Sequence, residues 1–169
     1  MDTVRRSSLS TARLAPIAPE VAVSGPCHVR AELIPLESTS RLQIVDVTDD
    51  VMERVRALGV QEGTATLQSL HTTCAVFVNE SQDALAADFV TFLESVVDPE
   101  DQWRHDDPAV SDCDRRNTDS HLRALVLSSS ITLQVSGGEL VLGQWQRVLV
   151  GELDGPRART LRLQVIGIV

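Results

Sequence analysis

The sequence predicts an α+β fold built on a largely antiparallel sheet or sandwich. Three observations lead to this class. Short apolar runs with alternating side chains recur along the chain, two helical segments interrupt them, and the last third consists of predicted strands joined by turns. Strands that follow one another through short turns pair antiparallel, and a few helices then pack beside the sheet. With 169 residues the chain is long enough for an ordinary core.

Residues 1–26 are expected to form a flexible N-terminal tail, and residues 27–169 a single domain. The tail is rich in Arg and Ser, and Pro16, Pro19 and Pro26 interrupt any period. A secretory signal would need an apolar central run after its arginines, and the tail has none.

The first half of the domain alternates predicted strands with helices. Apolar or alternating runs predict strands over residues 29–36, 41–47, 64–70 and 74–78. The helix after Val47 is expected to be capped by the Thr48 hydroxyl and to end at Gly59. Apolar residues at helical spacing from Leu85 to Val97 predict the main helix, with this stripe facing the core.

The second half begins with a long polar loop over residues 98–117, which is rich in Asp and Arg. Loops of this length in compact domains tend to be functional or disordered. A short helix over 117–127 follows. The alternation then predicts strands over residues 131–135, 140–143, 144–153 and 161–165, with a hairpin turn at 136–139 and a further turn at 154–156.

The charged residues exclude several functions. The net charge is −9, and all 15 basic residues are arginine, because the chain contains neither lysine nor tyrosine. Schiff-base, pyridoxal-phosphate and phosphate-loop mechanisms that need a lysine are therefore excluded. The acidic balance and scarcity of aromatic residues favour no nucleic-acid partner, and no apolar run is long enough to suggest a membrane partner.

Cysteine use predicts a reducing, cytoplasmic location. The three cysteines are far apart and form no paired framework. Cys74 lies in an apolar run, so core packing is its expected role. The alternative is a nucleophile activated by the nearby His71.

Four histidines are available for chemistry. His28 adjoins the tail and is expected to be solvated. His71, His105 and His121 belong to separate elements, and three converging imidazoles would form a metal site with an open position. The spacing matches no short metal motif, so each of the three could instead be an independent hydrogen-bonded side chain.

Several other polar groups have two interpretations. Glu80, which follows a strand with Asn79, is either a helix-capping acid or an acid/base group. Asp106 and Asp107 are either solvated loop charges or partners that orient the neighbouring histidine. Arg157 is either a surface charge or part of a phosphate-binding fork.

The same holds for three more residues. Arg159 could lie at the surface or bind phosphate together with Arg157. Gln144 and Gln146 would lie on one face of a strand by alternation, where they could line a pocket or meet solvent.

Taken in order, these segments resemble the YjbQ-like family, often called secondary thiamine-phosphate synthases. The similarity covers about residues 28–169 and rests on the ordered set rather than on any single motif. The segments are His71-Thr72-Thr73-Cys74-Ala75, Asn79-Glu80, Trp103-Arg104-His105-Asp106-Asp107, Asn117 with His121, Gly138-Glu139-Leu140-Val141-Leu142-Gly143-Gln144-Trp145-Gln146, and Gly155-Pro156-Arg157-Ala158-Arg159.

The resemblance implies a β-sandwich with two main helices, assembled as a homotrimer with pockets near the subunit contacts. It also implies that His71, His105 and His121 gather around a divalent metal. The residues that match positions near this cluster are Asn79, Glu80, Asn117, Gln144, Gln146, Arg157 and Arg159. Two departures stand out: Trp103 replaces the usual tyrosine, and residues 118–120 are more polar than usual.

The family name implies a transferase that couples a pyrimidine pyrophosphate to a thiazole phosphate at this site. This coupling could be a side activity. The hypothesis from the residues is that a His-bound metal and the two arginines hold the pyrophosphate, with Glu80 assisting. Imidazole ligands favour zinc or a similar transition ion, while magnesium is possible for pyrophosphate. The alternatives are a metal-dependent hydrolase of a small phosphorylated metabolite and a noncatalytic trimer that binds a small anion.

Overall fold

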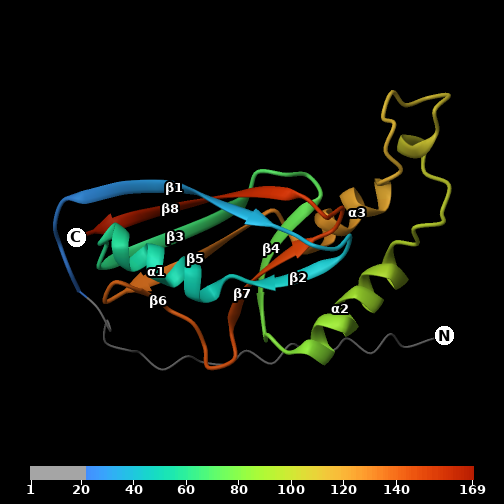
Figure 1. The fold of residues 1–169 in the computed structure, drawn as a ribbon. Helices are drawn as coiled ribbons and strands as arrows, with labels where there is room; N and C mark the ends of the chain where they lie inside the picture. The colour runs from blue at the N-terminus through green and yellow to red at the C-terminus, as the bar shows by residue number, and fades with distance from the viewer. Residues whose placement is uncertain (1–21) are drawn as a thin grey trace, which may run out of the picture.

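The computed structural model describes residues 22–169 and contains two antiparallel sheets (Figure 1). The five-stranded sheet has the order β1 (Cys27–Glu37), β8 (Ala158–Ile168), β3 (Glu62–Ser69), β5 (Ser130–Ser136) and β6 (Glu139–Leu140). The three-stranded sheet has the order β2 (Gln43–Asp46), β7 (Arg147–Glu152) and β4 (Cys74–Asn79). The helices are α1 (Thr48–Leu58), α2 (Asp83–Val96) and α3 (Thr118–Leu127). The predicted α+β class and β-sandwich are confirmed.

The core forms along the long strand β8, which lies between β1 and β3. Leu161, Leu163 and Val165 are fully buried, as the alternation predicts, and they pack against Ala65 and Leu67 of β3. The strand pairs with β1 over eleven residues and with β3 over eight. This sheet therefore holds both ends of the domain together. No helix among residues 22–169 is long and apolar enough to cross a membrane. Of the predicted tail, only residues 22–26 belong to the described residues.

Helix α1 packs against β6, β7 and β8, and it lacks the side-chain cap that was predicted for it. Val51 and Val55 are buried, and Gly59 ends the helix with a φ of 72°, as expected. The Thr48 hydroxyl, however, donates to Asp46 Oδ1 at 2.6 Å and accepts from an amide of β7, so it caps no amide of its own helix. The prediction of a Thr48 cap was wrong because a neighbouring strand competes for the hydroxyl.

Asp46 gives the start of α1 a dependence on pH. Burial by itself raises the pKa of this carboxyl, but hydrogen bonds from Arg147 and Thr48 outweigh it and hold the pKa at about 2, below the ordinary 3.8. A lowered carboxyl pKa adds stability that is present above the ordinary value and is lost as pH falls through the folded value. We expect Asp46→Asn to be less stable than the natural chain at pH 7, with the difference shrinking between pH 3.8 and about 2. Urea unfolding across this range measures it, and Asp50→Asn, on the exposed face of α1, is the control; a difference that does not change with pH would contradict it.

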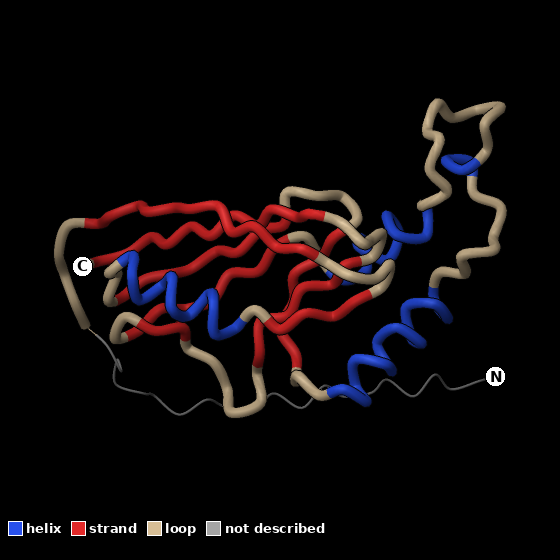
Figure 2. Tube along the Cα trace, in the orientation of Figure 1, coloured by secondary structure: helices blue, strands red, loops and turns tan. Residues whose placement is uncertain are grey.

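The apolar stripe of α2 is largely uncovered, which differs from the prediction that it faces the core. Leu93, in the helix, and Val97, just after it, are buried, whereas Phe92 and Val96 are more than half exposed. Figure 2 shows why: α2 lies beside the ends of the strands rather than across a sheet. A helical period identifies an apolar face but does not specify what covers it.

The last third confirms the hairpin but not both strands after it. Gly137 and Gly138 have φ values of 60° and 80°, the conformation that a tight turn between twisted strands requires. Strand β6 then stops at Leu140, and residues 141–146 form a loop in which Gln146 Oε1 accepts the Gly143 amide at 2.8 Å. The prediction that Gln144 and Gln146 lie on one face of a strand was therefore wrong. The Gln146 side chain instead closes a local turn.

Candidate functional site

Two of the predicted histidines lie next to each other. His105 occupies a single turn of 3-10 helix, Arg104–Asp106, in the long loop, and His121 lies on α3. Their ring centroids are 5.2 Å apart, with the rings nearly perpendicular at 88°. In the described part of the chain, His105 Nε2 is buried and has no hydrogen-bond partner. A buried imidazole nitrogen without a protein partner is available to a metal ion, a ligand or a water molecule.

The loop is tied to α3 by Asp106 rather than by the histidine itself. Asp106 Oδ1 accepts from the Thr118 hydroxyl at 2.6 Å and from the Thr118 amide at 3.2 Å. The carboxylate thus satisfies an amide at the N-terminus of α3, where negative charge is favourable. This bond holds the turn that carries His105 against His121. Asp106 therefore positions His105 only indirectly, through its hydrogen bonds to Thr118, and not by the direct contact that was predicted.

His71 lies in the turn between β3 and β4 and faces a different set of atoms. Its Nε2 accepts the backbone amide of Thr160 at 2.8 Å, and Ser69 Oγ accepts the His71 amide at 3.2 Å. His71 and His121 line one open groove of ≈ 630 Å³ together with apolar residues of α3 such as Leu122. The three histidines therefore approach one region of the molecule without meeting at one point.

A metal at this place would find two suitable imidazoles. His105 and His121 are adjacent, and the nitrogen without a partner fits a ligand atom. His71 does not fit, because Thr160 occupies its Nε2 lone pair. Within residues 22–169, no three His, Cys, Asp or Glu side chains lie close enough to hold an ion. The three-histidine metal site stays a prediction.

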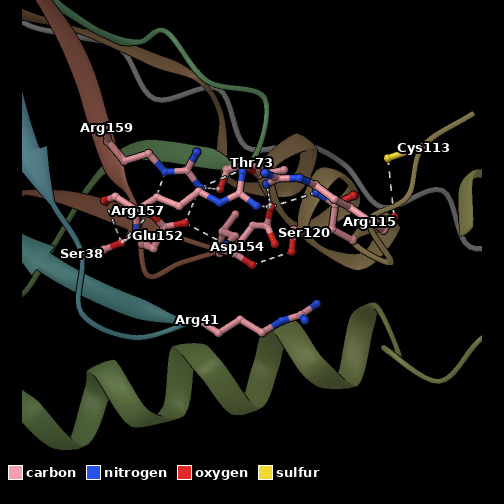
Figure 3. Close-up of polar contacts among 12 residues, drawn as sticks. Ser38, Arg41, Thr73, Cys113, Arg115, Ser120, Glu152, Asp154, Arg157 and Arg159 are labelled. Atoms are coloured by element: carbon pink, nitrogen blue, oxygen red, sulfur yellow. Dashed lines mark hydrogen bonds and ion pairs between the residues drawn. The ribbon is translucent and has the colours of Figure 1, made fainter.

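The predicted phosphate-binding residue Arg159 is closed off by a buried ion pair (Figure 3). Its Nε donates to Glu152 Oε2 at 2.6 Å, its Nη2 donates to Oε1, and Nη2 also donates to Thr73 Oγ1 at 3.0 Å. Both charged side chains are almost inaccessible. The bidentate bond to Glu152 raises the pKa of Arg159 further. This arginine holds the end of β7 to the start of β8, and its Nε and Nη2 are both engaged in hydrogen bonds.

Arg157, by contrast, keeps an open side. Its Nη2 lies 2.7 Å from Asp154 Oδ2, an oxygen that also accepts from Asn117 Nδ2 at 2.9 Å. Arg115 approaches the same oxygen at 3.8 Å. Both arginines are partly exposed, so most of their N–H groups remain available. Within the described residues, Asn117 Oδ1 is buried without a partner.

A second carboxylate continues this charged region onto α3. Asp119 accepts from Arg41 at 3.0 Å and from Arg123 at 2.8 Å, and the buried Arg123 also donates to the Val97 carbonyl after α2. We call the whole set the arginine corner. It consists of Arg41, Arg115, Arg123, Arg157 and Arg159 with Asp119, Glu152 and Asp154. Five guanidinium groups thus meet three carboxylates in a chain whose net charge is −9.

The remaining predicted residues form a second group at the far end of β4. Glu80 and Gln144 line a hollow with Asp46, Trp145 and Arg147. Asn79 and Gln146 lie beside this group, but each uses its side-chain oxygen for a local backbone bond. Strand β4 has six residues, so about 17–20 Å of extended chain separates the two groups. Within a single copy of the chain, Glu80 therefore lies at the opposite end of β4 from the histidines.

The comparisons with known proteins agree with this architecture. A protein-family model described as "UPF0047 protein YjbQ-like" matches residues 32–168. The chain belongs to this family. A relative, a UPF0047 protein from Methanothermobacter thermautotrophicus, is 35% identical over 140 residues, which cover 83% of this chain and 94% of the relative. The UPF0047 protein YugU from Bacillus subtilis is 29% identical over 136 residues, covering 78% and 96%.

Two solved structures have a fold similar to that of this chain. A protein of unknown function from Sulfolobus solfataricus matches with a TM-score of 0.78 and 29% identity, covering 83% of this chain and 99% of the other. A hypothetical protein from Aeropyrum pernix matches with a TM-score of 0.75 and 36% identity, covering 82% and 98%. The predicted family is therefore confirmed, together with its fold.

Sequence reasoning missed several members of the arginine corner in this YjbQ-like chain. Asp119 and Arg123 are four residues apart on one helix, a spacing that the sequence did display. Nothing in the local pattern identified Arg41, Arg115 or Asp154 as their neighbours. Cys74 is buried as expected, and burial raises the pKa of its thiol, which argues against an activated nucleophile.

Proposed function

We propose that this YjbQ-like chain is a thiamine-phosphate-synthase-like transferase. It would couple a hydroxymethylpyrimidine pyrophosphate to a thiazole phosphate and release pyrophosphate, as a main or a side activity. The observation that carries the proposal is the arginine corner, an excess of positive charge in an acidic chain, beside two histidines. Both substrates and the released pyrophosphate are anions, so a local positive focus is what their binding needs.

The chemistry asks for stabilisation of a leaving group rather than for a protein nucleophile. The bond between the pyrimidine methylene carbon and the pyrophosphate oxygen breaks, and the thiazole nitrogen bonds to that carbon. Arg115 and Arg157 share Asp154 and both keep part of their guanidinium surface exposed, so they would hold the departing pyrophosphate. Asp154 keeps both guanidinium groups in place, while the buried Arg159 supports the strand ends behind them.

A divalent transition ion such as zinc would be held by His105 and His121. When bound, such an ion would neutralise part of the charge that develops on the pyrophosphate, and magnesium could enter with the substrate. The hydrogen bond from the Thr118 hydroxyl to Asp106 would keep the two imidazoles at a constant separation. His121 also borders the apolar groove, which would exclude water from the ring of a substrate.

We also propose that the site is completed by a second copy in a homotrimer. Each copy carries the histidine pair at one end of β4 and Glu80 with Gln144 at the other. In a head-to-tail ring, one end of each copy meets the opposite end of its neighbour. The exposed Phe92 on α2 and Leu125 on α3 are apolar surface that such contacts would cover.

Substitutions in the corner test the transferase. We expect Arg115→Met and Arg157→Met each to lower kcat/KM for coupling by about 10- to 100-fold, because a charge-assisted hydrogen bond to phosphate contributes about 1.5–3 kcal/mol. Thiamine phosphate and pyrophosphate are measured together. The control is Arg54→Met on α1, whose partner is the distant Glu32.

The same assay separates the alternatives. Phosphate or pyrophosphate release without a coupling product identifies a metal-dependent hydrolase of a small phosphorylated metabolite. Tight binding of pyrophosphate without any turnover identifies a noncatalytic anion-binding trimer. Coupling that is equally fast in all three variants would show that the corner does not hold substrate.

A further inference from the structure

The end of strand β3 leaves one backbone amide of β8 without a strand partner. Ser69 pairs with Leu161 as the last residue pair of β3 and β8, so Thr160 lies one position beyond the ladder. The Thr160 carbonyl accepts the Leu70 amide at 3.1 Å. In an antiparallel ladder the N–H and C=O of one residue point to the same neighbouring strand. The Thr160 N–H therefore also points toward the turn that follows β3.

His71 supplies the acceptor that this amide requires. Its Nε2 lies 2.8 Å from the Thr160 nitrogen, so the ring takes the place of the next carbonyl of the strand. The backbone of His71 is held as well, because Ser69 Oγ accepts its amide and donates to its carbonyl at 3.2 and 3.3 Å. Ring and backbone are thus both anchored to the sheet.

The hydrogen bond determines the tautomer of the ring. A backbone amide can only donate, so the nitrogen that faces it carries a lone pair and no proton. A neutral imidazole has one donor and one acceptor nitrogen, which places the proton of His71 on Nδ1. Neither nitrogen then has a lone pair for a metal: Thr160 uses one, and the other carries hydrogen.

We infer that His71 is held in the Nδ1–H tautomer by the Thr160 amide and acts as a hydrogen-bond donor in the groove, not as a metal ligand. The groove that it lines with His121 is otherwise bordered by apolar residues and hydroxyls, among them Leu122, Ala124 and Ser128. Its ligand would be a small molecule with an apolar body and an acceptor oxygen or nitrogen. The donor role rests on the proposed function, in which His105 and His121 form the metal pair, and it gives His71 a separate task in the groove that it lines with His121.

Nuclear magnetic resonance of the full chain labelled with ¹⁵N tests the tautomer directly. At about pH 8, where imidazoles are normally neutral, long-range ¹H–¹⁵N correlations distinguish protonated from unprotonated ring nitrogens. We expect His71 to show an unprotonated Nε2 and a protonated Nδ1, unchanged when zinc is added. An Nε2–H tautomer, or a zinc-dependent change at either nitrogen of His71, would overturn the inference.

Two conservative variants separate the anchor from the donor. His71→Gln can place an oxygen where Nε2 accepts from Thr160 but loses the Nδ1 donor, whereas His71→Asn keeps a donor near Nδ1 and loses the anchor. We expect the thermal midpoint of His71→Gln to stay close to that of the natural chain and that of His71→Asn to fall. The reverse order would overturn the inference.

Zinc content keeps this result apart from the proposed function. His71→Gln is expected to bind as much zinc per chain as the natural protein, and His105→Ala to bind less. Loss of zinc in His71→Gln would overturn the donor assignment. If no form of the protein binds zinc, the metal in the proposed function fails, while the tautomer is still decided by the resonance measurement.

Discussion

Replacing Glu152 with glutamine is expected to lower the free energy of unfolding by about 3–5 kcal/mol, because it leaves the buried Arg159 guanidinium without a counter-charge. Both carboxylate oxygens of Glu152 are used: Oε2 accepts from Ser38 at 2.9 Å and from Arg159, and Oε1 accepts from the Asp154 amide at 2.8 Å. The neutral amide of glutamine would place a donor where one of these donors already lies. Urea unfolding at pH 7 measures the loss.

The pH dependence of this variant provides a second reading. Burial by itself raises the pKa of Glu152, but hydrogen bonds from Arg159, Asp154 and Ser38 outweigh it, so the pKa lies below the ordinary 4.5. The pair therefore contributes stability that is present above pH 4.5 and is lost as the pH falls further, through the lowered pKa. The acid limb of the stability curve should be shallower in Glu152→Gln than in the natural chain.

A surface pair supplies the matched control. Glu139 bonds Arg56 at 2.7 Å with both side chains more than half exposed, so Glu139→Gln should change stability by less than about 1 kcal/mol. Equal losses in the two variants would mean that burial of the Glu152 pair has no special weight. The double variant Glu152→Leu with Arg159→Met removes both charges, so it should lose less stability than Glu152→Gln. If it loses as much, the cause is packing rather than an unpaired charge.

Mixing two inactive variants is expected to restore coupling activity if the site is shared between copies. Glu80→Ala and His121→Ala each remove one of the two groups that β4 separates within a chain. In a head-to-tail trimer assembled from equal amounts of both, about one quarter of the sites join a natural His121 to a natural Glu80 from the neighbour. Activity should therefore return to about a quarter of that of the natural protein, measured after unfolding and refolding the mixture.

Mixing Glu80→Ala with Gln144→Ala should restore nothing, because both residues belong to the same group. No recovery in the first mixture would place the whole site within one chain or exclude one of the groups from it. The native mass must also be about 55 kDa, three times the 18.4 kDa of the chain; a monomer would rule out the shared site before any assay.

Local patterns predicted many elements well, because the physics that forms them is local. Gly59 ends α1, Gly137 and Gly138 make the hairpin turn, and the inward side chains of β8 follow the alternation. Each depends on residues within a few positions of one another. The errors arose where a distant group competes. A strand amide takes the Thr48 hydroxyl, and α2 leaves Phe92 exposed because no sheet lies beneath it.

The candidate site shows the same division. The order of the histidines and of the polar motifs was enough to identify the family, and it placed His105 in a long polar loop. The pairing of His105 with His121 depends on Asp106 reaching the N-terminus of α3, twelve residues away. No periodicity encodes that contact.

By itself, the sequence determined the fold class, the family and the set of chemical groups available, since composition excludes every lysine and tyrosine mechanism. Only the tertiary structure decided which groups are free to act. It closes Arg159 with Glu152, leaves Arg115 and Arg157 open around Asp154, and occupies Nε2 of His71 with an amide 89 residues away. The physical reason is that a buried donor or acceptor must find a partner wherever the strands end, and that partner comes from a distant part of the chain.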